Sequence, residues 1–143
     1  MSSVIAYTDG ACKSNPGPGG WGVLIIDGEV RSELFGGERD TTNNRMELTA
    51  AIEALKNTDA ARDIIIYADS KYVIDGITKW LPNWIRRGWK TADNKAVKNM
   101  DLWKALSEQV TSRRVEWRWV RGHAGDFGNE RADQLANFGV SSL

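Results

Sequence analysis

The strongest constraint on the fold is a short apolar run at residues 64–68, Ile-Ile-Ile-Tyr-Ala, which begins with three β-branched side chains. Apolar side chains on both sides of a strand are typical of a strand buried on both faces, as in parallel sheets that are covered by helices. The run therefore predicts a strand at a parallel position of such a sheet.

The segments around this strand alternate between strand-like and helix-like patterns. Further strands are predicted at 4–8, 21–26, 30–35 and 115–120, and Asp27-Gly28 is a strong hairpin signal. Helices are predicted at 44–56, from a cap at Ser70 to about 79, from Pro82 to about 87, near 102–110 and at 129–138, with loops at 13–20, 88–99 and 121–128. This order predicts a mixed sheet covered by helices on both faces, an α/β fold.

The length and charge of the chain set broad limits. A chain of 143 residues fits one domain, which we expect to span 1–143. The 19 basic and 19 acidic residues cancel, so only their distribution can indicate a polyanionic partner. The single cysteine excludes an intrachain disulfide, and neither a signal peptide nor a membrane-spanning run is recognisable. We therefore expect a cytoplasmic protein without a membrane partner.

Four carboxylates stand at positions that suggest a common site. Asp9 ends or nearly ends the first strand, and Glu47 lies in the first turn of a helix. Asp69 follows the buried strand, and Asp133 lies in the last helix. If the first and fourth strands are neighbours, Asp9 and Asp69 meet at one place on the sheet. Carboxylates gathered in this way raise one another's pKa or bind a cation.

An oxygen-only set of ligands favours Mg²⁺ or Mn²⁺ over zinc. Two such ions roughly 3.5–4 Å apart could activate a water molecule and stabilise the leaving oxygen of a phosphodiester. Each carboxylate also has a structural alternative. Asp9 could belong to a turn, Glu47 to a capping box with Asn44, Asp69 to a helix cap or turn, and Asp133 to a solvated helix face. Spacing alone leaves these alternatives open.

A series of motifs covers nearly the whole chain. They are Tyr-Thr-Asp-Gly-Ala-Cys at 7–12, Asn-Pro-Gly at 15–17, Gly-Trp-Gly at 20–22, Thr-Asn-Asn-Arg-Met-Glu at 42–47, Asp-Ser-Lys-Tyr-Val at 69–73, Gly-Trp-Lys-Thr at 88–91, Asp-Leu-Trp at 101–103, Val-Arg-Gly-His-Ala-Gly at 120–125 and Asn-Glu-Arg-Ala-Asp at 129–133. In this order they resemble the type 1 ribonuclease H family, which includes bacterial ribonuclease HI. A lone Thr-Asp-Gly would be a weak signal, but the ordered set is specific.

The resemblance implies a ribonuclease H-like fold, with a five-stranded mixed sheet flanked by helices. It implies an endonuclease that hydrolyses the RNA strand of RNA–DNA hybrids without sequence specificity, leaving 5′-phosphate and 3′-hydroxyl ends. Asp9, Glu47, Asp69 and Asp133 would hold two Mg²⁺ ions, which Mn²⁺ can replace. Asp9 would bridge both ions, and Asp133 would hold the more labile one.

The only histidine, His123, lies in a glycine-containing segment. A lone loop histidine is most often a surface residue. The resemblance instead implies that it assists proton transfer or product release, and imidazole titrates in the range that this role requires.

The resemblance also implies contacts with the hybrid. Recognition of hybrid shape needs contacts to 2′-hydroxyls on one strand and to phosphates on the other. The matching positions are Cys12, Asn15, Asn43 and Asn44, with Thr42 for a DNA phosphate. Lys71 stands where relatives carry glutamine, and lysine can donate to a phosphate but cannot accept from a 2′-hydroxyl.

Residues 79–98, here termed the basic handle, carry the clearest charge cluster. They contain six cations and one acid, with tryptophans interleaved. The resemblance implies that this handle holds DNA phosphates, through Trp80, Trp84, Arg86, Arg87 and Lys90. The structural alternative is a solvated helix face over packed tryptophans. We expect both in part, with the aromatic rings packed and the cations facing the duplex.

Two other functions compete with this hypothesis. One is a different two-metal nuclease of the same fold, such as a resolvase or transposase core, against which the continuous handle and the His-Ala-Gly segment argue. The other is a non-catalytic hybrid-binding module, against which the intact set of four carboxylates argues. We expect a monomeric enzyme.

Overall fold

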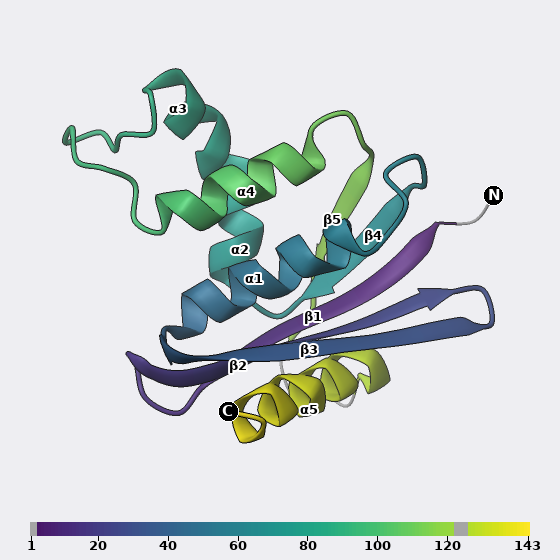
Figure 1. The fold of residues 1–143 in the computed structure, drawn as a ribbon. Helices are drawn as coiled ribbons and strands as arrows, with labels where there is room; N and C mark the ends of the chain where they lie inside the picture. Colours follow the sequence, from purple (N-terminus) through teal and green to yellow (C-terminus); the bar gives the residue numbers. More distant parts are fainter. Residues whose placement is uncertain (1–2, 122–125) are drawn as a thin grey trace.

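The computed structural model describes residues 3–121 and 126–143, and its sheet has five strands (Figure 1). The strands are β1 (Val4–Cys12), β2 (Gly17–Asp27), β3 (Val30–Thr41), β4 (Ile64–Ala68) and β5 (Val115–Trp119). Their order across the sheet is β3-β2-β1-β4-β5. The pairs β1–β2 and β2–β3 are antiparallel, whereas β1–β4 and β4–β5 are parallel. The predicted five-stranded mixed sheet is therefore confirmed.

Helices cover both faces of this sheet. They are α1 (Asn43–Lys56), α2 (Lys71–Asp75), the π-helical turn η1 (Gly76–Trp80), α3 (Leu81–Arg86), α4 (Met100–Val110) and α5 (Phe127–Ser141). Helix α5 packs on β1, β2 and β3, and α1 packs on the opposite face with α4 outside it (Figure 1). The core on the α1 side includes Leu48, Ile66 and Trp103, all fully buried. Burial of an aliphatic side chain such as Leu48 or Ile66 contributes about 1.5–3 kcal/mol, so this core stabilises the packing of α1 and α4 on the sheet.

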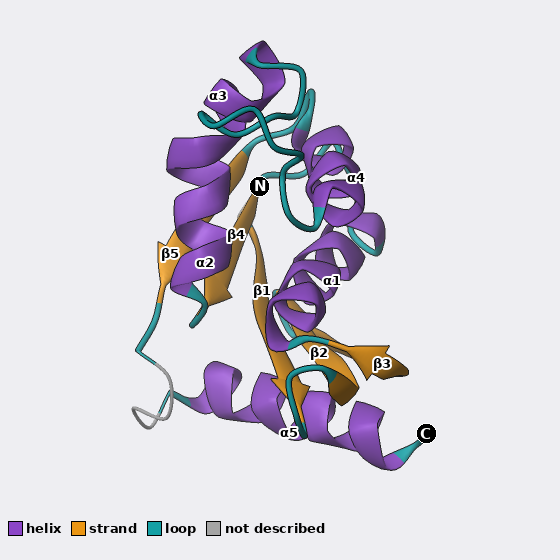
Figure 2. Cartoon of the chain, turned by 90° about the vertical axis from the view of Figure 1, so that its left-hand side faces the viewer, coloured by secondary structure: helices purple, strands orange, loops and turns teal. Residues whose placement is uncertain are grey.

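The prediction for β4 is correct in its position and only half correct in its burial. Ile64, Ile66 and Ala68 are buried on the α1 side, but Ile65 and Tyr67 are only half-buried. The reason is the placement of α5, which lies against β1, β2 and β3 (Figure 2). The second face of β4 is therefore less covered than the sequence pattern suggested.

The first three strands are longer than predicted. Strand β1 continues to Cys12, β2 begins at Gly17 inside the predicted loop, and β3 continues to Thr41. Glycines that looked like loop residues instead allow α5 to approach the sheet. A Cβ atom at Gly20 or Gly22 would collide with backbone carbonyls of α5. These glycines therefore serve close packing within strands.

The segment 71–86 also differs from the prediction of two separate helices. It forms α2, η1 and α3 without an intervening loop. Pro82 lies in the first turn of α3, where a backbone N–H would have no hydrogen-bond partner within the helix. A Cβ atom at Gly76 in η1 would collide with the ring of Trp103, so the glycine allows this segment to pack against α4. No helix in the described part of the chain is long and apolar enough to cross a membrane.

Candidate active site

Three of the four predicted carboxylates lie together. The parallel register pairs Thr8 with Ala68, so the residues that follow, Asp9 within β1 and Asp69 just after β4, lie side by side. Glu47 approaches from α1, where it is buried with 6% of its surface exposed. One carboxylate oxygen from each of Asp9, Glu47 and Asp69 lies within 4.8 Å of the other two. The topology therefore assembles an acidic cluster at the centre of the sheet.

A glycine allows the helix to come this close to the strand. A Cβ atom at Gly10 would lie 2.6 Å from the backbone nitrogen of Glu47 and 2.7 Å from the carbonyl carbon of Met46. Such distances are well inside van der Waals contact. Gly10 therefore permits α1 to rest directly on β1 and brings Glu47 to Asp9.

The capping alternatives for Glu47 and Asp69 and the turn alternative for Asp9 do not hold. Asp9 lies within β1, which continues to Cys12, and not in a turn. Thr42 caps α1, because its hydroxyl accepts the N–H of Arg45 at 3.2 Å, so Asn44 and Glu47 form no capping box. Ser70 caps α2 as predicted, so Asp69 is not the capping residue. Glu47 and Asp69 thus have no helix-capping role, and Asp9 has no turn role.

Asp133 lies nearby on α5. Its charge and its hydrogen bonding both contribute to the raised pKa of Asp9, which places the two side chains close together. Its backbone carbonyl accepts from the Asn137 amide at 2.9 Å. Asp133 is half-buried, so it stands at the open side of the cluster, next to the three carboxylates that converge more tightly.

The cluster is electrostatically strained as long as it holds no cation. Burial raises the pKa of Asp9 to about 9, with the neighbouring charge of Asp69 as the second cause. Burial likewise raises the pKa of Glu47 well above its usual range, followed by the charge of Asp9. Glu47 Oε1 and Asp69 Oδ1 are buried without a hydrogen-bond partner among the described residues. Unpartnered buried oxygens in an oxygen-only set match the preference of a hard divalent cation, so these residues fit a metal site.

The predicted hybrid-contacting residues gather beside the start of α1. Asn15 Oδ1 accepts the backbone N–H of Asn43 at 2.9 Å, which ties the segment between β1 and β2 to α1. The Cys12 thiol donates to the carbonyl of Ser14 at 2.8 Å and lies 3.6 Å from that of Thr41. Asn43 and Asn44 are exposed. Their amides are therefore accessible, whereas Thr42 is occupied in capping the helix.

Lys71 lies close to the acidic cluster in a way that the sequence did not reveal. Its ammonium nitrogen is 4.3 Å from the centre of the Trp119 ring, within the range of a cation–π contact. The indole N–H of Trp119 in turn donates to the backbone carbonyl of Asp69 at 3.2 Å. Trp119 was not predicted as a site residue, and no local motif would have indicated its contact with Asp69.

The basic handle combines packed rings with exposed cations. The Trp80 ring is 6.1 Å from Tyr72 and 5.9 Å from Trp84, and Trp84 is 5.2 Å from Trp103. Arg86, Arg87 and Lys90 are all exposed. A hollow between the two groups is lined by Trp80, Asn83, Trp84, Arg87, Lys90 and Ala92. His123, the remaining predicted residue, lies outside the described residues.

Fold and site together define an α/β protein with a candidate metal-binding carboxylate cluster, assembled from β1, α1 and the residue after β4, and with an exposed cationic handle. The RNase H family profile matches residues 1–141. Ribonuclease HI of Pseudomonas aeruginosa is 63% identical over 140 residues, covering 98% of this chain and 95% of that protein. Ribonuclease H of Bordetella bronchiseptica is 62% identical over 139 residues, covering 97% and 90%.

Solved structures agree with these relatives. LC9-RNase H1, described as a type 1 RNase H with the type 2 active-site motif, has a TM-score of 0.87 and 37% sequence identity. The match covers 99% of this chain and 74% of that one. The chain belongs to the RNase H family and is an enzyme of that family.

Proposed function

We propose that the protein hydrolyses internal phosphodiester bonds in the RNA strand of RNA–DNA hybrids, independently of sequence, and leaves 5′-phosphate and 3′-hydroxyl ends. The observation that carries this proposal is the convergence of Asp9, Glu47 and Asp69 within 4.8 Å, with Asp133 beside Asp9. Family membership and the names of the relatives support the same reaction.

Two divalent cations, Mg²⁺ or its substitute Mn²⁺, would supply Lewis acidity and a water molecule of lowered pKa when bound. Asp9 would contact both, because it interacts with each of the other three carboxylates. Glu47 and Asp69 would hold the ions from either side, with Asp133 contributing from the open side. In this arrangement the chain's own contribution is to fix four oxygen donors on helices and strands at one place on the sheet.

His123 is proposed to move a proton near the scissile bond. An imidazole with an ordinary pKa near 6.5 can accept or donate a proton at neutral pH, which the carboxylates engaged with cations cannot do. Its contribution is assistance to turnover or product release, because the acidic cluster remains complete without it.

Hybrid recognition is proposed to use two surfaces. The start of α1 and the segment that follows β1 would contact the minor groove, through Cys12, Asn15, Asn43 and Asn44, with Thr42 near a DNA phosphate. The handle would contact DNA phosphates through Arg86, Arg87 and Lys90, with Trp80 and Trp84 forming the floor beneath them. Lys71, held over Trp119, would reach a phosphate near the cluster.

The decisive experiment is cleavage of an end-labelled RNA–DNA hybrid, with duplex DNA and duplex RNA as parallel substrates, with and without Mg²⁺. We expect Mg²⁺-dependent cutting of the RNA strand of the hybrid alone, at many positions, with ends that a 5′-phosphate-dependent exonuclease can degrade. Cutting of duplex DNA would favour a resolvase- or transposase-like nuclease. Tight hybrid binding without cutting would favour a non-catalytic binding module.

We also propose that the chain acts as a single domain and a monomer in the cytoplasm.

A further inference from the structure

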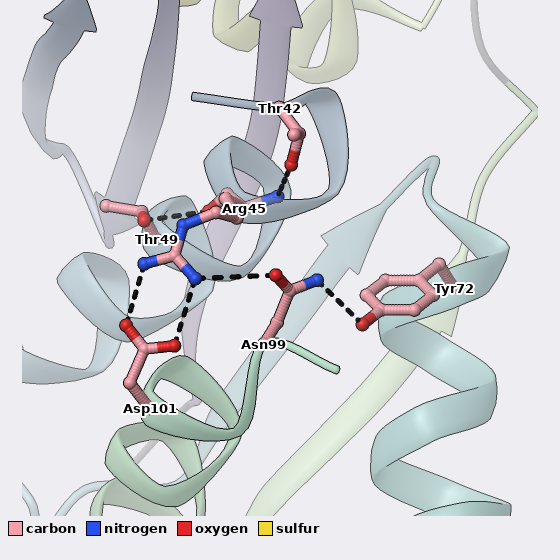
Figure 3. A network of polar contacts seen from close by, with 6 residues as sticks. All are labelled: Thr42, Arg45, Thr49, Tyr72, Asn99 and Asp101. Carbon is pink, nitrogen blue, oxygen red and sulfur yellow. Dashed lines mark hydrogen bonds and ion pairs between the residues drawn. The ribbon is translucent and has the colours of Figure 1, made fainter. Parts of the chain in front are cut away.

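A chain of polar contacts joins α1, α2 and α4 (Figure 3). Arg45 on α1 makes a two-pronged ion pair with Asp101 on α4, at 2.9 Å and 2.7 Å. The same guanidinium donates to the side-chain oxygen of Asn99 at 3.3 Å. The amide nitrogen of Asn99 then donates to the Tyr72 hydroxyl on α2 at 3.1 Å. Neither catalysis nor a direct hybrid contact accounts for this chain of contacts.

Asn99 is suited to the middle of this chain. It follows the handle directly and adopts a left-handed backbone conformation, with φ of 61°, which asparagine tolerates better than most residues. Although it occupies the N-cap position of α4, its side chain makes no capping hydrogen bond. Its amide instead accepts from one helix and donates to another at the same time, which few side chains can do.

Tyr72 connects the chain of contacts to both ends of the handle, through its hydroxyl at one end and its ring at the other. It also accepts the indole N–H of Trp103 at 2.9 Å. The Tyr72 ring contacts Trp80, which lies near the start of the handle, and Asn99 follows the end of the handle. The beginning and the end of residues 79–98 are therefore attached to the same tyrosine.

At its other end, the chain of contacts reaches the first residues of α1. Arg45 follows Asn43 and Asn44 directly and precedes Glu47 by two residues. The Thr42 hydroxyl accepts the backbone N–H of Arg45. The backbone carbonyl of Arg45 accepts the Thr49 hydroxyl at 2.8 Å. The backbone of Arg45 is therefore fixed within α1 while its guanidinium holds α4 and Asn99.

We propose that Arg45 is a positioning residue that, with Asp101, Asn99 and Tyr72, holds the handle at a fixed place relative to the start of α1. The proposal rests on the proposed function, in which these two surfaces contact the same hybrid. Fixing their separation preorganises the enzyme for a duplex that must touch both, which lowers the entropic cost of binding. The ion pair is partly exposed, with 30% of the Arg45 side chain and 65% of the Asp101 side chain accessible, so solvent weakens its contribution to global stability and its effect is mainly positional.

The test is Asp101→Asn, which keeps the shape of the side chain and removes its charge. We expect KM for a long hybrid to rise about three- to tenfold, the scale of coupling within one network, while kcat stays unchanged. The matched control is Asp27→Asn. Asp27 is likewise a solvent-accessible carboxylate, and it accepts two hydrogen bonds from the guanidinium of Arg62, at 3.0 Å each. This control should leave both KM and kcat unchanged.

A double-mutant cycle separates positioning from direct contact. If the network acts by placing the handle, Asp101→Asn should have little further effect once Arg86, Arg87 and Lys90 have been replaced by alanine. It should also have little effect on a hybrid so short that the triple handle variant no longer changes its KM. Additive effects, or an equal effect on the short hybrid, would overturn the proposal.

A second variant tests the other end of the chain of contacts. Tyr72→Phe retains the ring that contacts Trp80 and Trp103 but removes the hydroxyl that Asn99 needs. It should reproduce the KM effect of Asp101→Asn and be non-additive with it. If the wild type cleaves hybrids but both variants behave like Asp27→Asn, the positioning role is refuted and the proposed function stands. Wild-type protein that neither binds nor cleaves hybrids would instead refute the proposed function.

Discussion

Replacing Asp9 by asparagine should abolish cleavage and, without metal, stabilise the protein. Burial and the neighbouring carboxylates hold the pKa of Asp9 at about 9, against an ordinary value of 3.8. The folded state therefore retains a proton that the unfolded chain releases above its own pKa. The free energy of unfolding must then fall as pH rises from about 4 to about 9.

The size of this effect follows from the same pKa. At pH 7, a group that is ionised when unfolded and protonated when folded costs about 1.36 kcal/mol for each pH unit above 3.8, or roughly 4 kcal/mol in all. Glu47, whose pKa is also raised, remains buried in the cluster, so removing the Asp9 carboxylate recovers only part of the cluster's cost. We expect Asp9→Asn to be more stable than the wild type by about 2–4 kcal/mol at pH 7 without metal.

The measurement is urea unfolding of both proteins in EDTA at pH 5.5, 7 and 8.5. Wild-type stability should decrease over this range, and the variant should show a shallower decrease. Adding Mg²⁺ should stabilise the wild type, because the cation replaces the missing proton, and should stabilise the variant much less. An Asp9→Asn protein that is less stable than the wild type, or that cleaves hybrids at a near-normal Mg²⁺-dependent rate, would refute this reasoning.

Three further variants probe other parts of the molecule. His123→Ala should lower kcat by up to roughly 10²–10⁴-fold without eliminating it, whereas full kcat at every pH would make the imidazole a bystander. Replacing Arg86, Arg87 and Lys90 by alanine should raise KM, leave kcat nearly unchanged and reduce the log–log salt slope of hybrid binding by about 0.9 per lost phosphate contact. An unchanged slope would mean that these cations are only solvated. Gly22→Ala should lower the urea midpoint, because its Cβ would displace α5, and an unchanged midpoint would contradict that packing.

Much of the fold could be predicted from local patterns. The run at 64–68, the Asp27-Gly28 hairpin and the Ser70 cap each depend on residues close together in the chain, and each lies where it was expected. The segment 17–20 was misjudged because a glycine in a loop and a glycine beneath a packed helix look alike in a sequence. What distinguishes them is the approach of α5.

The candidate site was less accessible to local reasoning. The positions of Asp9 and Asp69 after two strands suggested a meeting only if those strands were neighbours, and the parallel β1–β4 pairing supplies that condition. Glu47 would have been equally well explained by a cap until Thr42 proved to be the capping residue. Contacts such as Arg45–Asp101, which spans 56 positions, leave no periodic trace in the sequence.

The dispersal of the acidic residues along the chain has a consequence for protein synthesis. The cluster needs β1, α1 and β4, and Asp133 comes only with α5, which follows all five strands in the sequence. A partly synthesised chain can therefore pair its early strands without possessing the complete set of acidic side chains. The acidic cluster forms only once β4 has paired with β1, and it would be lost whenever that pairing opens, because the pairing is what brings Asp9 and Asp69 together.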